Sequence, residues 1–277
     1  MTLPVIRRLL VALLPSQAAE LSRLDDPTNQ PATAVVIDTL RFTTTASQAL
    51  ELGARSVHVS SSVEQAIQLA AELPTRPLLC GERHCHPIEG FDVGNSPLEL
   101  TRALVEGRDL VFTTTNGTLA VDAVRHIPSV LLGALVNRHA VCQRVSASTA
   151  GHVLLVCSGT DGQLTWEDVL TAGAIIDELC RAENFQYGHD TARLAHAAWQ
   201  ATEGRNAVAL DAVPRDTKRP SEVALRRSAR LEMELSHSIG GRNLLESGFQ
   251  SDVHFAAQLD SLTAVAQNSS QNPLAFC

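Results

Sequence analysis

The sequence predicts a three-layer α/β/α fold, in which helices cover both faces of a mainly parallel or mixed sheet. Short apolar runs rich in β-branched residues alternate with helix-like segments from Thr33 to Cys180, which is typical of parallel strands joined by helical crossovers. Polar and small residues follow several of these runs directly. The 277 residues are 44% hydrophobic, which provides enough apolar material for a buried core.

The expected strands are residues 9–14, 34–38, 56–60, 77–80, 110–113, 130–132 and 152–157. The expected helices between them are residues 44–52, 63–73, 97–106, 118–125, 140–145 and 166–181. One helix start is especially clear, because Ser96, Pro97 and Glu99 stand in the order of an N-cap, a first-turn proline and a capping-box glutamate. Glu167 and Asp168 mark a second start, since acidic residues are favoured in a first helical turn.

The length is compatible with one catalytic domain over residues 1–266, built as a single unit or as two lobes with a boundary within residues 150–190. Beyond Asn184 the pattern changes to polar helices at residues 191–203 and 221–237, which predict a helical cap or a partner surface. Residues 267–277 are rich in Asn, Ser and Gln, and we expect a flexible tail there.

Charge and cysteine content exclude several classes of protein. A formal net charge of −8 argues against nucleic-acid binding, which requires dense Lys and Arg. No apolar run approaches the roughly 20 residues of a membrane span. The six cysteines lack the spacing of a disulfide framework, which favours reduced thiols and a cytoplasmic protein.

The first chemically dense junction follows the expected strand 34–38. Asp38 ends that strand, Arg41 follows, and the hydroxyls of Thr43, Thr44 and Thr45 enter the next helix. Ligands of open parallel sheets bind at the carboxyl ends of strands, so Asp38 is placed to hold a metal or to act as a nucleophile. Helix capping by the same residues is the alternative.

A second junction follows the strand 110–113. It contains Thr114, Thr115, Asn116, Gly117 and Thr118. Glycine permits close backbone approach, and free amides at a helix N-terminus favour an oxyanion. The cluster of hydroxyls around one glycine therefore predicts an anion-binding turn.

A third junction and a long loop add further candidates. Ser158 and Gly159 leave room at the end of strand 152–157, and the acidic pair Glu167 and Asp168 could bind a hard cation or simply cap a helix. The loop 81–95 contains further charged and amide side chains, at Glu82, Arg83, Asp92 and Asn95. Carboxylates there could bind a cation while an arginine binds an oxyanion, although loops are also polar because they are solvated.

Other familiar chemistries are not supported by the motifs. Cys80, His84, Cys85 and His86 do not have the spacing of two zinc-ligand clusters. Cys157 has no arginine six residues later, and Asp38 has no second aspartate two residues later, so two common phosphatase signatures are absent. No Gly-Lys-Ser/Thr phosphate loop occurs.

Together, the motifs resemble the 2-phosphosulfolactate phosphatase family, whose members catalyse a step of coenzyme M biosynthesis. The matching segments are residues 36–45, 81–83, 90–97, 113–118 and 157–159, with Glu167-Asp168 and a fainter match at residues 241–244 and Asp252. This resemblance implies an oligomeric α/β enzyme, with a dimer as the simplest form, that uses Mg²⁺ to hydrolyse a phosphate ester of a small sulfonated acid. The histidine-rich residues 84–86 depart from the family pattern.

We therefore expect catalysis by Asp38, Arg41 and Glu82. The candidate metal ligands are Asp38, Glu82, Asp92, Glu167 and Asp168, and the candidate substrate contacts are Thr43, Thr44, Thr45, Arg83, Asn95, Thr114, Thr115, Asn116, Gly117, Thr118, Ser158 and Gly159. Such a set could position and neutralise a phosphoryl group. The alternatives are a phosphatase for another phosphorylated hydroxy acid, a lyase or transferase acting on a phosphate substrate, and a regulatory protein that binds an anion or nucleotide without turnover.

Overall fold

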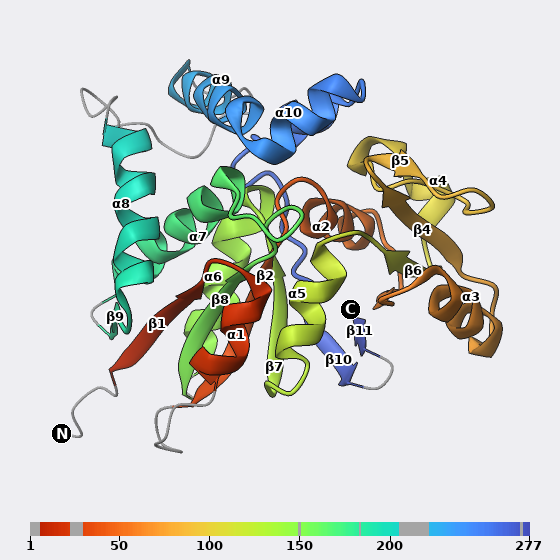
Figure 1. Cartoon of the computed structure of the whole chain (residues 1–277), viewed down its shortest axis with the longest axis horizontal. Coiled ribbons are helices and arrows are strands. Elements are labelled where there is room, and N and C mark those ends of the chain that lie inside the picture. The colour runs from red at the N-terminus through yellow and green to blue at the C-terminus, as the bar shows by residue number, and fades with distance from the viewer. Residues whose placement is uncertain (1–5, 23–29, 149–150, 183, 205–221, 272–273) are drawn as a thin grey trace.

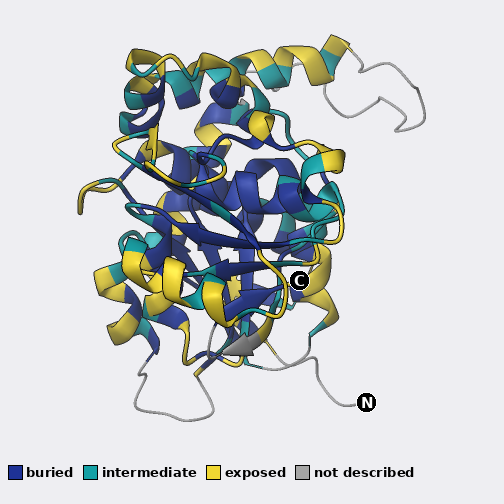
Figure 2. Ribbon diagram, turned by 90° about the vertical axis from the view of Figure 1, so that its right-hand side faces the viewer, coloured by how far each residue is buried: buried dark blue, intermediate teal, exposed yellow. Residues whose placement is uncertain are grey.

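The computed structural model describes residues 6–22, 30–148, 151–182, 184–204, 222–271 and 274–277. Its described strands form two sheets with helices around them (Figure 1). The strands lie in the buried interior, while exposed residues are concentrated on the outer helices (Figure 2). The predicted three-layer α/β architecture is confirmed.

The first sheet has the strand order β7-β2-β8-β1-β9, and all of its paired strands are parallel. Its strands are β1 (Arg7–Ala12), β2 (Pro31–Ile37), β7 (Ser129–Gly133), β8 (His152–Cys157) and β9 (Phe185–Tyr187). Successive side chains of β1 enter different buried clusters, since Leu9 packs on one face and Leu10 on the other. This burial on both faces explains why the strands are continuous apolar runs.

Helices cover both faces of this sheet (Figure 1). On one face lie α6 (Arg138–Ala147), α7 (Trp166–Leu179) and α8 (Asp190–Gly204), and Ile175 of α7 packs in the same buried cluster as Leu155 of β8. On the other face lie α1 (Pro15–Ser22), α2 (Phe42–Glu51) and α5 (Gly117–Val124). The chain enters α6 through a short 3-10 turn, η3 (Leu135–Asn137).

The second sheet is mixed and has the order β10-β11-β3-β6-β4-β5. Its strands are β3 (Ser56–Val59), β4 (Leu78–Arg83), β5 (His86–Pro87), β6 (Asp109–Thr113), β10 (Asn268–Gln271) and β11 (Leu274–Phe276). The helix α3 (Val63–Glu72) packs on β6 and β4. Phe42 of α2 meets Phe112 of β6 edge to face, with ring centroids 5.6 Å apart, so one core joins the two sheets.

The C-terminal helices cover the carboxyl ends of the first sheet (Figure 1). They are α9 (Glu222–His237), α10 (Ile239–Glu246) and α11 (Gln250–Ala256). Leu231, Leu244 and Val253 belong to one buried cluster, which fixes these helices to each other and to Ala174 of α7. The predicted polar helices 191–203 and 221–237 correspond to α8 and α9, whereas α10 and α11 were not predicted. Residues 205–221 lie outside the described residues.

The predicted helix at residues 97–106 is wrong in extent. Ser96 does begin a helical turn, because its hydroxyl accepts a hydrogen bond from Leu98 N–H, but this 3-10 turn, η2 (Pro97–Glu99), is brief. Leu100 is extended, and Thr101 caps a separate short helix, α4 (Arg102–Val105). Glu99 accepts from Gly94 N–H instead of completing the predicted capping box.

The segment 267–277, for which we expected a flexible tail, instead supplies β10 and β11. Phe276 of β11 pairs with Val57 of β3 and is fully buried. The Asn268 side-chain carbonyl accepts a hydrogen bond from Val130 N–H (2.7 Å), which ties the segment to β7 as well. The polar residues suggested disorder, but three consecutive apolar residues near the end of the chain, Leu274 to Phe276, are buried.

Among the described helices, none combines the length and the apolarity that crossing a bilayer requires.

We predict that Phe276→Ala will lower the free energy of unfolding by about 3–5 kcal/mol, because it leaves a cavity in the shared core. Leu98→Ala is the matched control: Leu98 is half exposed, and its truncation should cost less than about 1 kcal/mol. Urea unfolding monitored by circular dichroism measures both values. A loss for Phe276→Ala no larger than that of the control would show that the segment is not part of the core.

Candidate functional site

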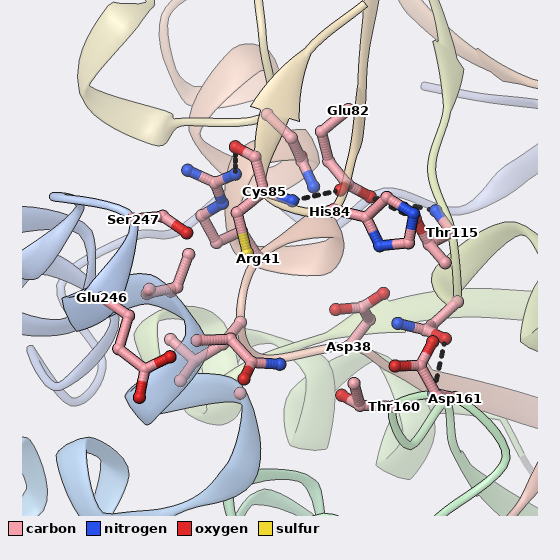
Figure 3. A pocket seen from close by; sticks show the side chains of 16 residues that line it. Asp38, Arg41, Glu82, His84, Cys85, Thr115, Thr160, Asp161, Glu246 and Ser247 are labelled. Atoms are coloured by element: carbon pink, nitrogen blue, oxygen red, sulfur yellow. Dashed lines mark hydrogen bonds between the residues drawn. The ribbon is translucent and has the colours of Figure 1, made fainter.

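A cavity of about 330 Å³ lies where strands of both sheets end and α10 covers them (Figure 3). Its lining comes from the ends of β2 and β4, the turns after β6 and β8, and α10. The lining residues are Asp38, Leu40, Arg41, Glu82, His84, Cys85, Asn95, Thr115, Asn116, Thr160, Asp161, Gly240, Asn243, Leu244, Glu246 and Ser247. The carboxyl ends of parallel strands are the usual location for a ligand site in such folds.

Asp38 follows the last residue of β2 and is almost fully buried. Its Oδ1 accepts a long hydrogen bond from Phe42 N–H (3.3 Å), whereas Oδ2 has no hydrogen-bond donor among the described residues. Gly117 faces this oxygen closely, because a Cβ at that position would lie 2.4 Å from Oδ2. A side chain at Gly117 would therefore displace Asp38.

The threonines after Asp38 hold the turn rather than line the cavity. The Thr43 hydroxyl donates to the Asp38 carbonyl (2.8 Å), and the Thr44 hydroxyl donates to the Thr39 carbonyl (2.8 Å). The Thr45 hydroxyl donates to the carbonyl of Asn95 (2.9 Å), which joins this turn to the loop before η2. All three side chains are buried and fix the position of Asp38.

Asp168 connects the ends of β2 and β8. Its Oδ1 accepts from Thr39 N–H (2.9 Å), and its Oδ2 accepts from the Ser158 hydroxyl and Gly159 N–H (both 3.0 Å). Ser158 and Gly159, predicted to contact substrate, thus serve this junction and do not line the cavity. Both oxygens of Asp168 are already occupied by donors.

Glu167 lies beneath the first turn of α10 and is nearly inaccessible to solvent. A Cβ at Gly240 would lie 2.1 Å from Glu167 Oε1, so only glycine allows α10 to approach this closely. Oε2 is buried and has no hydrogen-bond partner in the described part of the chain. Glu167 therefore supports the covering helix rather than projecting into the cavity.

These acids raise one another's pKa. Burial raises the pKa of Asp38 well above its ordinary value, and the Asp168, Glu82 and Glu167 carboxylates raise it further. Burial, and then the charge of Asp168, raises the pKa of Glu167 to about 7. Burial also raises the pKa of Asp168, although its hydrogen bonds oppose this. Burial and mutual repulsion therefore favour the protonated form of these acids, and a bound cation would favour the charged form.

Glu82, near the end of β4, joins two loops. Its Oε1 accepts from the N–H (2.9 Å) and hydroxyl (3.1 Å) of Thr115, and its Oε2 accepts from Cys85 N–H (2.9 Å). Glu82 lines the cavity through this network. It orients both the turn after β6 and the β4–β5 turn.

The predicted anion-binding turn after β6 reaches the cavity in part. Thr115 and Asn116 line it, and α5 begins at Gly117. The Thr118 hydroxyl is buried and donates to the Thr114 carbonyl (2.9 Å), so it stabilises the turn from the protein interior. Thr114 is also buried, and its hydroxyl has no partner in the described structure.

Arg41 lines the cavity but is already engaged in a buried ion pair. Its Nη1 donates to Asp252 Oδ2 (2.8 Å) and its Nη2 donates to the Cys85 carbonyl (2.9 Å). The guanidinium also stacks 4.2 Å from the centre of the Phe249 ring. Arg41 thus links α2, the β4–β5 turn and α11. The Asp252 carboxylate balances the charge of its guanidinium.

Two further predicted residues, Arg83 and Asp92, also lie outside the cavity lining. Arg83 donates to the Thr113 hydroxyl (3.1 Å) and to the Glu82 carbonyl (2.7 Å) and is not among the lining residues. Asp92 pairs with Arg76 (2.7 Å) and accepts from Leu79 N–H (2.9 Å), near the opposite end of β4. Asn95, in contrast, lines the cavity, and its buried Oδ1 has no partner among the described residues.

Several lining residues were not predicted. His84 and Cys85 have φ values of 51° and 68° in the β4–β5 turn, and this left-handed backbone directs both toward the cavity (Figure 3). Asp161 has a φ of 51° in a second tight turn, before Gly162. An Asp-Gly pair between apolar runs is a recognised turn signal that would have identified Asp161. For α10 the sequence offered only the faint family match at residues 241–244.

No three His, Cys, Asp or Glu side chains of the described chain are grouped closely enough to hold a metal ion by themselves. The five predicted carboxylate ligands therefore do not form one protein cage. Asp38 fits a cation best, because its Oδ2 is an oxygen without a donor on a wall of the cavity.

A family model described as 2-phosphosulpholactate phosphatase matches residues 19–219. The chain belongs to this family. The family resemblance predicted from the motifs is thus confirmed, and the matched region contains Asp38, Glu82 and the turn after β6, whereas α10 lies beyond it.

Three relatives carry the name "Probable 2-phosphosulfolactate phosphatase". The protein from Synechococcus sp. (strain CC9605) is 49% identical over 147 residues, 53% of this chain and 60% of that protein. The protein from Caldanaerobacter subterraneus is 45% identical over 153 residues, 55% and 63% of the two chains. The protein from Deinococcus radiodurans is 37% identical over 233 residues, 83% and 85%. The chain thus spans about three fifths of the length of the first two relatives.

We predict that Glu167→Gln will flatten the pH dependence of stability. A carboxyl whose folded pKa of about 7 exceeds its ordinary 4.5 stabilises the fold most below pH 4.5 and loses this contribution as pH rises to about 7. Glutamine mimics the protonated acid at every pH. The variant and the parent should melt at similar temperatures at pH 4.5, and the variant should melt higher at pH 8.

Differential scanning calorimetry in metal-free buffer measures this difference, and Asp38 and Asp168 are unchanged in both proteins. An equal loss of melting temperature at both pH values would instead mean that Glu167 is ionised in the folded protein.

Proposed function

We propose that this chain hydrolyses the phosphate monoester of a small hydroxy acid, with 2-phosphosulfolactate as the first candidate substrate. One observation supports this most strongly: the open Oδ2 of Asp38 shares a cavity with the Thr115-Asn116 turn at the start of α5. A carboxylate beside an amide-rich turn suits a reaction that needs positioning and neutralisation of a phosphoryl group. The names of the relatives support the choice of substrate.

The charge of the cavity implies a cationic cofactor. Four lining residues carry carboxylates, namely Asp38, Glu82, Asp161 and Glu246. The lining guanidinium of Arg41 is balanced by Asp252. A phosphate monoester brings about two further negative charges, so binding it against this lining would be repulsive without a cation.

Mg²⁺ is the cofactor that we propose. It is commonly held by one or two carboxylates, with water and substrate phosphate completing an octahedral shell, so a preformed protein cage is not required. Asp38 would be its main ligand, with the lining carboxylate of Asp161 a candidate for a second contact (Figure 3). When bound, such an ion neutralises phosphoryl oxygens and lowers the pKa of bound water.

The chain's own residues would orient the substrate. The Asn116 side-chain amide lines the wall beside Asp38 and can donate through Nδ2 to phosphoryl oxygens, while Thr115, whose hydroxyl donates to Glu82, shapes the same wall. Asn95 adds a further side-chain amide, which makes no hydrogen bond to another described residue. Glu82 accepts hydrogen bonds from the Thr115 turn and from the β4–β5 turn and so fixes their relative position. It would therefore be a positioning residue.

Several predictions from the sequence remain proposals at this point. They are a homo-oligomer, a cytoplasmic location and a place in coenzyme M biosynthesis.

We predict that Asp38→Asn will lower kcat for magnesium-dependent phosphate release by at least about 100-fold, because it removes the carboxylate that holds the cation. Thr44→Ser serves as a control in the same turn, since it keeps the hydroxyl bonded to Thr39 and should retain near-parental activity. Phosphate release is measured colorimetrically, and circular dichroism checks that both variants fold. Full activity in a folded Asp38→Asn protein would remove the central assignment.

We also predict that EDTA will abolish phosphate release and that added Mg²⁺ will restore it. The screen should include phosphorylated hydroxy acids with and without a sulfonate, each assayed with Mg²⁺ or with EDTA. Activity that survives exhaustive chelation would contradict the proposed cofactor. Tight binding of these substrates without any product would favour an anion-binding regulatory protein.

A further inference from the structure

One face of α10 forms a wall of the cavity. Gly240, Asn243, Leu244 and Ser247 line the cavity at positions i, i+3, i+4 and i+7, which is a single stripe of an α-helix and its C-cap. Such a stripe normally carries apolar side chains that pack in the core. Here two of its positions are polar, and they face a cavity.

The cavity has two ends of different chemistry (Figure 3). Asp38, Thr115 and Asp161 lie together at one end, where the phosphoryl group is proposed to bind. Ser247 lies toward the other end, beside Arg41 and Cys85. A substrate whose phosphate occupies the first end would extend its remaining atoms toward α10.

The polar groups of α10 are available for a ligand. The Asn243 side chain makes no hydrogen bond to another residue in the described part of the chain, although its backbone carbonyl accepts from Ser247 N–H. The Ser247 hydroxyl contacts the Cys85 thiol, which is a weak partner that a stronger acceptor can replace. Both side chains can donate to an oxyanion.

Two glycines and a capping serine hold α10 close to the cavity. Gly240 lies against Glu167, and a Cβ at Gly241 would lie 1.8 Å from the Leu235 carbonyl, so both glycines are required for this close packing. Ser238 caps the helix by accepting from Gly241 N–H (3.0 Å). The helix is therefore a fixed wall, and Asn243 and Ser247 have defined positions in the cavity.

We propose that Asn243 and Ser247 bind the acid group at the far end of the substrate and thereby determine which phosphate esters are hydrolysed. This inference rests on the proposed phosphatase function and adds the residues that select the substrate. Arg41 supplies a third donor at the same end, and its charge is balanced by Asp252, so the acid group is recognised mainly by hydrogen bonds. The α10 residues lie beyond the family model at residues 19–219, and the sequence there matches the family pattern only faintly, at residues 241–244.

Glu246 allows a second test, because its removal should change substrate binding in the opposite direction. It lines the same end of the cavity and is exposed at its rim, and its carboxylate opposes a second negative charge. Removing donors from α10 should weaken the binding of an acidic substrate, whereas removing this carboxylate should strengthen it. Damage to the helix cannot produce both effects.

The experiment uses two substrates that differ only in the acid group, 2-phospholactate and isopropyl phosphate. For Asn243→Ala and Ser247→Ala we expect the KM for 2-phospholactate to rise about 10-fold, as for the loss of a hydrogen bond to a charged group, with the KM for isopropyl phosphate within about 2-fold of the parent. Glu246→Gln should lower the KM for 2-phospholactate only. Leu245→Ala, on the exposed side of α10, is the control and should change neither value.

Equal changes for both substrates, or no change for either, would overturn the proposal, as would a rise in KM with Glu246→Gln. Calorimetric titration of the same two compounds in the presence of Mg²⁺ separates this inference from the proposed function. If the parent binds both compounds but hydrolyses neither, the phosphatase proposal fails, while a selective loss of affinity for 2-phospholactate in the α10 variants would still support the acid site. Unselective binding would overturn it independently of turnover.

Discussion

The organisation of the site depends on the burial of carboxylates at the place where strands of two sheets end. Asp168 accepts three hydrogen bonds and thereby holds the ends of β2 and β8 together. Glu82 accepts three more and aligns the turns after β4 and β6. Once these acids are occupied, Asp38 remains as the buried carboxylate with an open oxygen on the cavity. When it is ionised, this carboxylate has no cationic partner among the described residues, so a bound cation would stabilise its charged form.

Several charged residues around the cavity mainly hold the surrounding helices and turns together. Arg41 is buried against Asp252 and Phe249, so much of its role is to hold α11 and the β4–β5 turn against α2. Only glycine fits at positions 117 and 240, because Asp38 and Glu167 occupy the adjacent space. The cap helices therefore belong to the same packed unit as the strand ends, and the wall that α10 provides is as fixed as the floor beneath it.

Local patterns predicted the fold well and the site in part. The apolar runs identified β1 to β4 and β6 to β8, because burial on both faces leaves a clear signal in the sequence. The predicted site residues Asp38, Glu82, Thr115 and Asn116 do line one cavity. Arg83 follows Glu82 directly in β4, so its side chain points to the other face, where it contacts Thr113, and Asp92 in the following loop is held away from the cavity by Arg76. The wall formed by Asn243 and Ser247 could not be predicted, because it arises from tertiary packing of α10 on Glu167.

The most direct test of this account is the affinity of the protein for Mg²⁺, measured by calorimetric titration in the absence of substrate. The parent, Asp38→Asn and Asp92→Asn should be compared in the same buffer. The account predicts that Asp38→Asn weakens Mg²⁺ binding at least about 10-fold, while Asp92→Asn, whose carboxylate is bound to Arg76 and Leu79 away from the cavity, leaves it unchanged. Equal affinity in the parent and Asp38→Asn would contradict the central claim that this open carboxylate is the cation site.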